Sequence, residues 1–371
     1  MYVTIREGGA PRQARWRSAG LPAPGRVGEA TDATRADPAF RRLFRGESLL
    51  YSGDYHNARQ LLAALGRRLR PPPPQPSLAE AFRAERRFRR LERDVLSRLL
   101  VPVDAEFAVA LRRAPEVAPA ALREVWGAPD GEPSVVPLRE LLGLIGAHEW
   151  RRKGVAVPAL GGSVHPHYGV FAPVRGEYVG LVAEALGRRN LRGRAAFDVG
   201  TGTGVLAFLA ARAGARVRAT DADPRAVACA RENAARLGLA SAVEVEEADL
   251  FPEGRADLVL CNPPWLPGEP LGPVDAAVYD PGGRFLAGFV AGLAAHLAPG
   301  GEGLLVLSDL AERLGLRPAG ALEASFAAAG LTVTSRAEAR PAHPRARDAS
   351  DPLHAARAAE VTTLYVLSAS S

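Results

Sequence analysis

The sequence predicts an α/β fold in which residues 151–371 form a doubly wound, seven-stranded sheet, and two observations predict it. From residue 194 onward, short apolar runs alternate with segments of helical spacing, as in strand–helix–strand units of a parallel sheet. The last two apolar runs, 331–336 and 361–367, are joined by a polar loop without a crossover helix. That arrangement predicts a terminal antiparallel hairpin.

The elements of this sheet follow one another in a regular order. We expect strands at 194–199, 216–221, 243–248, 256–261, 303–307, 331–336 and 361–367, and helices at 178–186, 205–213, 224–237 and 284–298. Each predicted helix places apolar side chains three and four residues apart, and each strand is a short apolar run bounded by glycine, proline or polar residues.

Three regions differ in composition. Residues 1–37 are rich in Gly, Pro, Ala and Arg without periodicity, so we expect a flexible N-terminal arm. Residues 38–150 carry helical spacing, and we expect a mostly helical domain that recognises the substrate. Its proline run at 71–76 is a candidate joint, and the capping box Ser77–Glu80 starts the next helix. Residues 151–371 form the third region.

The charge is concentrated in the N-terminal part. Residues 1–150 hold 24 basic and 18 acidic side chains, a net charge of +6, whereas residues 151–371 hold 23 of each. A basic module of this kind can face RNA, DNA or a ribosome. The arginines can equally be the solvated faces of helices, and that alternative stays open.

Composition also limits the class of protein. Hydrophobic residues make up 47% of the 371 residues, enough for a substantial core, and no apolar run reaches the roughly 18 residues of a membrane span. The N-terminus lacks the apolar segment of a secretory signal. Cys229 and Cys261 fall in a predicted helix and a predicted strand, as buried thiols of a reducing compartment. We therefore expect a cytoplasmic protein with no membrane partner.

A glycine-rich turn follows the first predicted strand and precedes a helix. Its glycines alternate, at Gly200, Gly202 and Gly204, and Asp198 lies two residues before the first. Glycines let the backbone bend sharply and approach a ligand closely, and the helix N-terminus offers free N–H groups. Residues 202–207 also satisfy the loose G-x-G-x-x-G/A pattern, so the turn alone leaves an NAD site open.

The longer pattern D-x-G-x-G-x-G resembles the first motif of the class I S-adenosylmethionine (SAM)-dependent methyltransferases. The resemblance implies that the turn holds the amino-acid end of SAM and that Asp198 orients the turn or the amine; a purely structural Asp198 is the alternative. Asp221 ends the second strand, where an acid can bind both ribose hydroxyls. The resemblance also implies that Asp249 meets the adenine amino group, with Leu250 and Phe251 against the ring.

The segment Asn262-Pro263-Pro264-Trp265 directly follows the fourth strand. It resembles the (D/N/S)-P-P-(Y/F/W) motif of methyltransferases that modify a planar NH₂ group. The nitrogen of such a group is a poor nucleophile because its lone pair is delocalised. The side-chain oxygen of Asn262 and the carbonyl of Pro263 can accept its two N–H bonds and aim the lone pair at a methyl group. Pro264 stiffens the backbone and Trp265 can stack on the acceptor, although an ordinary Pro-Pro turn would also fit this position.

A loop with paired histidines precedes the first helix of the sheet. We reject a metal site at His165 and His167, because no cysteine or carboxylate cluster accompanies them. The next residues, 169–177, resemble the GVF-x-P-x-x-x-E region of HemK/PrmC glutamine methyltransferases and of relatives that modify ribosomal RNA. The resemblance implies a loop over substrate or cofactor, with Phe171 and Arg175 as substrate-binding residues.

Two polar loops are expected near the acceptor pocket. The loop 266–283 contains Asp280-x-Gly-Gly, which weakly resembles the HemK-like pattern. The loop 337–360 can bind substrate or be disordered, and both possibilities stay open. Its candidate residues are Arg340, His343, Arg345, Arg347 and His354.

These motifs together predict an enzyme, a SAM-dependent N-methyltransferase with SAM as its cofactor and no metal. The HemK/PrmC resemblance implies that the acceptor is a glutamine side-chain amide of a translation-related protein. The alternative acceptor is an exocyclic amine of adenine or guanine in RNA or DNA; the basic N-terminal part favours it, and a base in a duplex would have to be flipped out. A non-catalytic binding protein and an NAD oxidoreductase are less favoured, and a test of SAM binding separates both from the methyltransferase.

Overall fold

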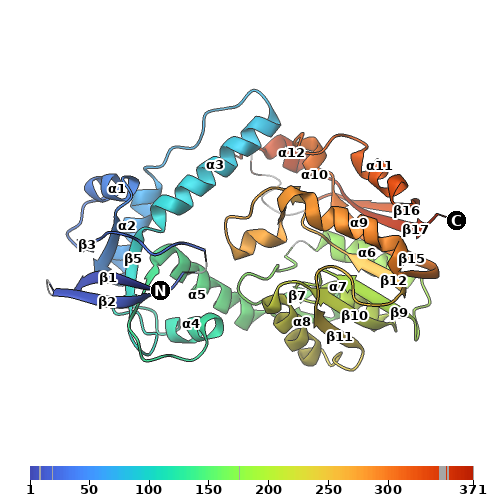
Figure 1. Ribbon diagram of the computed structural model, residues 1–371, viewed down its shortest axis with the longest axis horizontal. Helices are drawn as coiled ribbons and strands as arrows, with labels where there is room; N and C mark the ends of the chain where they lie inside the picture. The colour runs from blue at the N-terminus through green and yellow to red at the C-terminus, as the bar shows by residue number, and fades with distance from the viewer. Residues whose placement is uncertain (8–9, 19, 175, 342–347, 349–350, 371) are drawn as a thin grey trace. The chain divides into compact units, whose positions relative to one another are not determined.

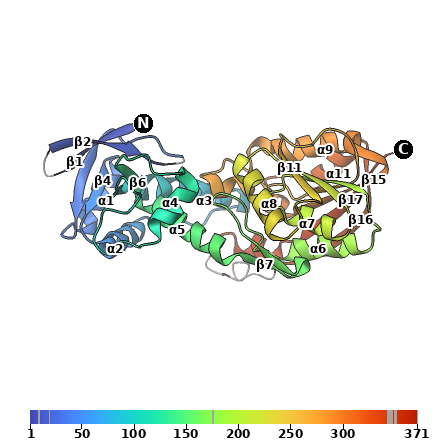
Figure 2. The ribbon, with the colours of Figure 1, turned by 90° about the horizontal axis from the view of Figure 1, so that it is seen from below.

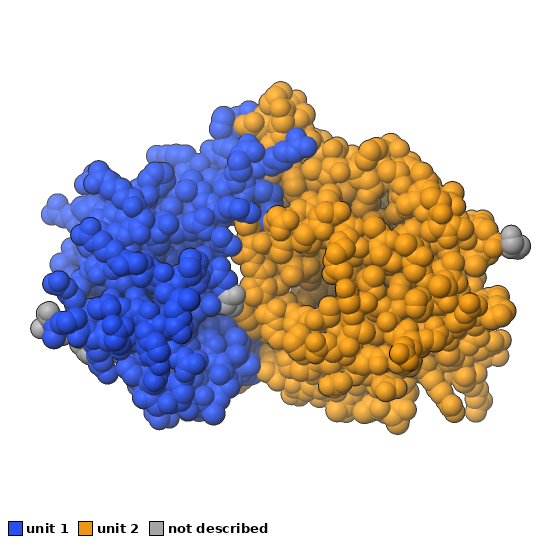
Figure 3. All heavy atoms as spheres, viewed as in Figure 1, with its two compact units in different colours: residues 1–74, 83–149 blue, residues 75–82, 150–371 orange. Residues whose placement is uncertain are grey.

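The chain divides into two compact units, which Figure 3 shows in different colours. The computed structural model describes residues 1–7, 10–18, 20–174, 176–341, 348 and 351–370. The first unit holds residues 1–74 and 83–149, and the second holds residues 75–82 and 150–371. The chain thus passes from the first unit to the second between residues 74 and 75, inside the proline-rich run. It does so again between residues 149 and 150, next to the domain boundary expected at residue 150.

The second unit is built on a seven-stranded sheet with the strand order β11-β10-β9-β12-β15-β17-β16 (Figure 1). The strands are β9 (Ala195–Val199), β10 (Arg216–Asp221), β11 (Val243–Glu247), β12 (Ala256–Cys261), β15 (Leu297–Ser308), β16 (Leu331–Ala339) and β17 (Thr362–Ala369). The first five in the spatial order pair in parallel, while β17 pairs antiparallel with both β15 and β16. The predicted doubly wound sheet with a terminal antiparallel pair is confirmed.

Alternate residues of the central strands face opposite sides of this sheet. On β12, Leu258 and Leu260 belong to one hydrophobic cluster, whereas Val259 and Cys261 belong to another. The first cluster includes side chains of α6 (Glu177–Gly187), α7 (Val205–Arg212) and α8 (Pro224–Arg236), and the second includes those of α9 (Arg284–His296) and α11 (Ala321–Ala328). Figure 2 shows α9 and α11 on one side of the sheet and α6 and α7 on the other. Covering both faces requires nearly continuous apolar runs, which explains the strand sequences.

Short elements complete the second unit. A small antiparallel pair joins β7 (Val155–Val157) and β8 (Gly162–Val164) around η1 (Pro158–Leu160), and a parallel pair joins β13 (Leu266–Pro267) and β14 (Tyr279–Asp280). The remaining pieces are η2 (Pro273–Ala277), η3 (Pro281–Gly283), α10 (Leu310–Arg313) and α12 (His354–Ala359). Both cysteines are buried, as expected. Among the described residues, no helix has the length and apolar character that crossing a membrane requires.

Two details of the sheet differ from expectation. Strand β15 begins six residues early, because Ala256 of β12 already pairs with Leu297 before an irregularity in the register. The segment between β16 and β17 contains the short helix α12, where only a polar loop was expected. Leu353 and Ala356 are buried in a cluster with Leu310 and Leu314, so a small apolar contact is enough to order this helix.

The first unit contains a six-stranded mixed sheet in the order β1-β2-β6-β5-β4-β3. Its strands are β1 (Tyr2–Glu7), β2 (Ala10–Trp16), β3 (Val27–Thr31), β4 (Ser48–Ser52), β5 (Leu99–Val103) and β6 (Ser134–Pro137). Strands β3, β4 and β5 are parallel neighbours, and β6 is antiparallel to β5. Its helices are α1 (Ala36–Phe44), α2 (Tyr55–Gly66) and α4 (Ala118–Trp126), together with α3 (Leu78–Leu96) from Arg83 onward and α5 (Leu138–Lys153) up to Glu149. The capping box before α3 forms as expected, since the Glu80 N–H donates to the Ser77 hydroxyl.

The prediction of a flexible arm at residues 1–37 is wrong. Strands β1, β2 and β3 all lie in this segment, and Val3, Ile5 and Ala14 are buried in a cluster with Leu50 and Leu100. The apolar side chains at positions 3 and 5 alternate with polar ones, which is the two-residue period of a strand. The description of residues 38–150 as mostly helical is incomplete, because it omits strands β4, β5 and β6.

Candidate functional site

The glycine turn between β9 and α7 is organised by a buried carboxylate. Asp198 is 1% exposed, and its Oδ2 accepts hydrogen bonds from the Thr201 hydroxyl (2.7 Å) and the Ala207 N–H (3.0 Å). Burial raises its pKa to about 6. Because these bonds tie the carboxylate to both ends of the turn, its geometry suits orientation of the backbone.

The glycines of this turn are required by backbone conformation. Gly200, Gly202 and Gly204 have φ values of 74°, 55° and 91°, in the left-handed region that other residues rarely adopt. A Cβ on Gly204 would lie 2.2 Å from the Phe208 ring, whereas a Cβ on Gly202 would meet no atom within 4 Å. The turn therefore packs tightly at its end and leaves open space at Gly202, which lines a cavity.

Asp221, the last residue of β10, faces the same turn. Its two carboxylate oxygens accept one backbone N–H each, from Gly202 (3.0 Å) and from Asp223 (3.0 Å). Burial raises its pKa. The side chain lines the cavity beside Gly202, at the carboxyl edge of the sheet. A carboxylate there retains lone pairs that can accept hydroxyl groups of a ligand.

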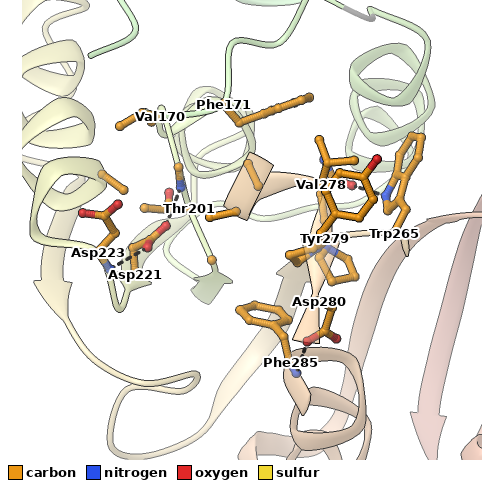
Figure 4. Close-up of a pocket in the computed structure, with 18 of the residues that line it drawn as sticks. Val170, Phe171, Thr201, Asp221, Asp223, Trp265, Val278, Tyr279, Asp280 and Phe285 are labelled. Carbon is orange, nitrogen blue, oxygen red and sulfur yellow. Dashed lines mark hydrogen bonds between the residues drawn. The ribbon is translucent and has the colours of Figure 1, made fainter. Parts of the chain in front are cut away.

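The cavity has a volume of about 980 Å³ and lies at the carboxyl ends of β9, β10 and β12 (Figure 4). Its walls come from the loop before α6, the glycine turn, the segment after β10, the segment after β12, the β13–β14 region and the end of α12. The predicted site residues that line it are Phe171, Asp198, Gly200, Gly202, Asp221, Asn262, Pro263, Pro264 and Trp265. The structure thus brings the glycine turn and the Asn-Pro-Pro-Trp segment, far apart in sequence, to one hollow.

Asn262 has a fixed orientation in this hollow. Its Oδ1 accepts a hydrogen bond from the Trp265 indole N–H at 2.9 Å, and Figure 4 shows this bond beside the Trp265 ring. Because indole nitrogen only donates, the atom that faces it must be the amide oxygen. Trp265 itself packs against the hydrophobic clusters on both faces of the sheet. One lone pair of the Asn262 oxygen is used within the motif, and the second stays available.

The loop before α6 is tied to the glycine turn by a residue that was not predicted. Asn233 of α8 is fully buried; its Oδ1 accepts the His165 N–H (2.8 Å) and its amide donates to the Thr203 carbonyl (3.1 Å). His167 bonds Glu232 through Nε2 at 2.8 Å. No group of three potential metal ligands occurs among the described residues. The hydrogen bonds at His165 and His167 anchor this loop, and Phe171 at its end lines the cavity.

The β13–β14 region carries a second unpredicted contact. Asp280 is buried and caps α9, because its carboxylate accepts the N–H groups of Phe285 (3.0 Å) and Leu286 (3.1 Å). The Phe285 ring lies so close to Gly200 that a Cβ there would be 2.8 Å away. The weakly recognised Asp-x-Gly-Gly pattern thus places an aromatic ring against the glycine turn. The glycine run indicated close packing, but nothing in it identified the partner.

Gly204 ends the glycine turn but does not line this cavity, and neither do Asp249, Leu250 and Phe251, the three residues predicted at the adenine ring. Asp249 pairs with Arg284 (2.9 Å), which does line it, and Phe251 is stacked between Phe289 and His296. Leu250 has a φ of 74° and packs toward the α9 side of the sheet. Their role at an adenine ring stays a prediction.

Some predicted residues lie outside the described part of the chain. Arg175 is one of them, and in the loop 337–360 so are His343, Arg345 and Arg347. The end of that loop does reach the cavity, where Arg357 and the buried Glu360 line the wall. The Ser308 hydroxyl donates to Glu360 at 2.7 Å.

Comparisons with known proteins point to one group of enzymes. The family model PrmA, described as ribosomal protein L11 methyltransferase, matches residues 180–264. The chain is 40% identical over 144 residues to the release factor glutamine methyltransferase of Cereibacter sphaeroides, covering 34% of this chain and 50% of that protein. It is 35% identical over 214 residues to the enzyme of the same name from Deinococcus radiodurans, covering 54% and 72%.

A ribosomal protein L11 methyltransferase is similar over a shorter stretch. The protein from Pelotomaculum thermopropionicum is 41% identical over 149 residues, covering 39% of this chain and 41% of that protein. The chain spans about half the length of the first of these relatives. None of these similarities covers more than 54% of the 371 residues, and the family-model match, at residues 180–264, lies in the second unit.

Proposed function

The chain belongs to the HemK/PrmC-like class I SAM-dependent methyltransferases, and from this premise we propose that it methylates the side-chain amide of a glutamine in a translation-related protein. The observation that carries the proposal is the Asn262–Trp265 hydrogen bond at the wall of the cavity. It holds a neutral acceptor atom in one orientation, as recognition of an NH₂ group requires.

The residues around the cavity fit SAM. Gly202 leaves open space where another residue would carry a Cβ, and Asp221 presents a carboxylate next to it. In this assignment the glycine turn holds the amino-acid end and Asp221 accepts the ribose hydroxyls. When bound, SAM supplies a methyl group on a positively charged sulfur, which is already a strong electrophile.

The contribution of the protein is then mainly orientation. The free lone pair of the Asn262 oxygen accepts one N–H of the acceptor amide, and the Pro263 carbonyl accepts the other. These two hydrogen bonds draw electron density toward the amide nitrogen and fix the direction of its lone pair. Pro263 and Pro264 have no N–H groups, so they offer no competing donor. Trp265 forms the adjoining wall of the cavity.

Transfer of radiolabelled methyl from SAM tests this function. The full chain is incubated with labelled SAM and with separated protein and RNA fractions of its source cells. We expect label in a protease-sensitive product that yields N5-methylglutamine on enzymatic digestion. The variant Asn262→Ala removes the proposed acceptor atom. Asn190→Ala is its matched control, because Asn190 is exposed and does not line the cavity. Label that resists protease and disappears with nuclease would contradict the proposed acceptor.

A nucleic-acid base is the second candidate acceptor. The net charge of +6 in residues 1–150 favours it, and an exocyclic amine presents the same planar NH₂ group to Asn262. The nuclease arm of the same experiment decides between the two acceptors. Absence of SAM binding by calorimetry would contradict both.

A further inference from the structure

Helix α3, which belongs to the first unit from Arg83 onward, has a face that is rich in arginine. Arg83, Arg87 and Arg90 are exposed and lie three or four residues apart, so their side chains share one stripe of the helix. At a rise of about 1.5 Å per residue, the stripe is about 10 Å long. At the other end of the helix, Val95 and Leu96 are buried, which anchors α3 in its unit.

Other arginines of the same helix are paired with acids. Arg89 forms ion pairs with Glu85 (3.4 Å) and Glu92 (3.1 Å), and Arg93 bonds the neighbouring Asp94 (2.9 Å). The helix therefore contains enough acidic residues to pair part of its positive charge. The pairing is selective, because it leaves out the three arginines of the stripe.

The stripe itself has no acidic partner among the described residues. No ion pair or hydrogen bond joins the side chains of Arg83, Arg87 and Arg90 to another described group. Like charges at these spacings repel one another and destabilise a helix. Asp94 lies next on the stripe, but Arg93 already holds its carboxylate. A cluster of unpaired guanidinium groups on an ordered helix is suited to an external polyanion.

We propose that the stripe of Arg83, Arg87 and Arg90 binds the phosphate backbone of an RNA. The planar guanidinium fork matches phosphate oxygens better than a lone ammonium does, and closely spaced charges suit the high charge density of a nucleic acid. The first unit also carries the charge excess of the chain. The choice of RNA over DNA or an acidic protein rests on the proposed function, because a methyl-accepting protein that takes part in translation is found in complexes with RNA.

A charge-matched pair of variants tests the stripe. The triple variant R83Q/R87Q/R90Q is compared with R35Q/R45Q/R59Q, which removes three exposed arginines from other parts of the first unit. The probe is a fluorescent single-stranded RNA of about 20 nucleotides, long enough for a site of the usual size. Binding to the full chain is measured by anisotropy between low and physiological salt.

We expect the stripe variant to reduce the slope of log affinity against log salt by about 2, because each lost phosphate contact to a single strand removes roughly 0.7. The control variant should change the slope by less than half as much. An equal loss in both variants, no binding by the wild type, or equal competition by poly-glutamate would overturn the proposal. Tighter binding to DNA of the same sequence would also contradict the assignment to RNA.

Two further measurements separate this inference from the proposed function. SAM affinity by calorimetry should be the same in the wild type and both variants, because the stripe lies in the first unit. The melting temperature of the stripe variant should equal or exceed that of the wild type, because the substitutions remove like-charge repulsion along the helix. Loss of RNA binding with intact SAM binding supports the stripe. A chain that binds RNA through the stripe but does not bind SAM would refute the enzyme and leave the stripe standing.

Discussion

Both units place aspartates at the ends of parallel strands, but the surroundings of these carboxylates differ. In the second unit, Asp221 ends β10 at the wall of the cavity and accepts only backbone N–H groups. In the first unit, Asp32 directly follows β3, and its Oδ1 accepts from the Tyr51 hydroxyl, the Asp54 N–H and the Asn57 amide. Arg112 binds its other oxygen.

The pKa shifts of the two carboxylates have opposite directions. Burial raises the pKa of Asp221, whereas the Asp54 N–H and the Tyr51 hydroxyl lower the pKa of Asp32. A carboxylate with many donors is stabilised in its charged form and holds the fold together. An acid at a strand end therefore indicates a site only where a glycine turn and a cavity lie beside it.

Asn262→Ala should have the largest effect, on catalysis. Loss of the side-chain oxygen removes an acceptor that orients the substrate nitrogen, so methyl transfer should fall by about 100- to 1000-fold. SAM affinity should change by no more than a few fold, because the residue is assigned to the acceptor end. Initial rates with labelled SAM and calorimetric titration check both parts. Unchanged turnover would remove Asn262 from the mechanism.

Asp198→Asn should change how stability depends on pH. With its pKa raised to about 6, the folded state holds a proton between about pH 4 and pH 6 that the unfolded state has released. Wild-type stability is therefore lost as the pH rises through this window. Asparagine cannot titrate, so the variant does not lose this stability. Between pH 4 and pH 7, the difference in free energy of unfolding between variant and wild type should therefore shift in favour of the variant by up to about 3 kcal/mol.

Urea unfolding at four pH values measures this difference. Glu244→Gln is the control, because Glu244 is an exposed carboxylate on β11 of the same sheet. The absolute stability of Asp198→Asn should be lower at every pH: its amide oxygen can accept both hydrogen bonds that Oδ2 accepts, but its NH₂ group is then buried in place of Oδ1. A difference in free energy of unfolding between the wild type and Asp198→Asn that stays constant across the pH range would show that Asp198 does not titrate as its burial requires.

Trp265→Phe should have a smaller effect on catalysis than Asn262→Ala. Phenylalanine keeps an aromatic ring in the wall but cannot donate to the Asn262 oxygen, so the amide loses its fixed orientation. One lost hydrogen bond of ordinary strength corresponds to a decrease of roughly 3- to 10-fold in kcat. The KM for SAM should stay unchanged. Equal rates of methyl transfer in the wild type and Trp265→Phe would mean that an aromatic ring at position 265 is sufficient for catalysis without the hydrogen bond.

The parts of the site that could be predicted are those in which adjacent residues act together. The glycine turn has a fixed spacing from Asp198, and Asn262 lies in a compact motif directly after a strand. Asn233 and Phe285 could not be found in this way, because they act through long-range contacts: Asn233 with the His165 N–H and the Thr203 carbonyl, and Phe285 with Gly200. Nothing in the neighbouring sequence marks such a contact.

The sheet of the first unit was missed for a different reason. Strands β4, β5 and β6 have only four or five residues, and an apolar run of that length fits a buried helix as well as a strand. Strand β4 lies between two helices and was included in their helical pattern. Its identity depends on pairing with β3 and β5, which are distant in sequence.

Asp32→Asn should have the smallest effect and should act on the first unit alone. Because the folded-state pKa of Asp32 is lowered, its contribution to stability is present above the unfolded pKa near 4 and is lost as the pH falls further. The variant should therefore melt at a lower temperature than the wild type at pH 7, and the two should converge toward pH 3. Glu116→Gln, an exposed carboxylate of the same unit, should leave the melting temperature unchanged. SAM affinity should be the same in all three proteins at pH 7, and a weaker affinity in Asp32→Asn would break the distinction between a structural carboxylate and a ligand-binding one.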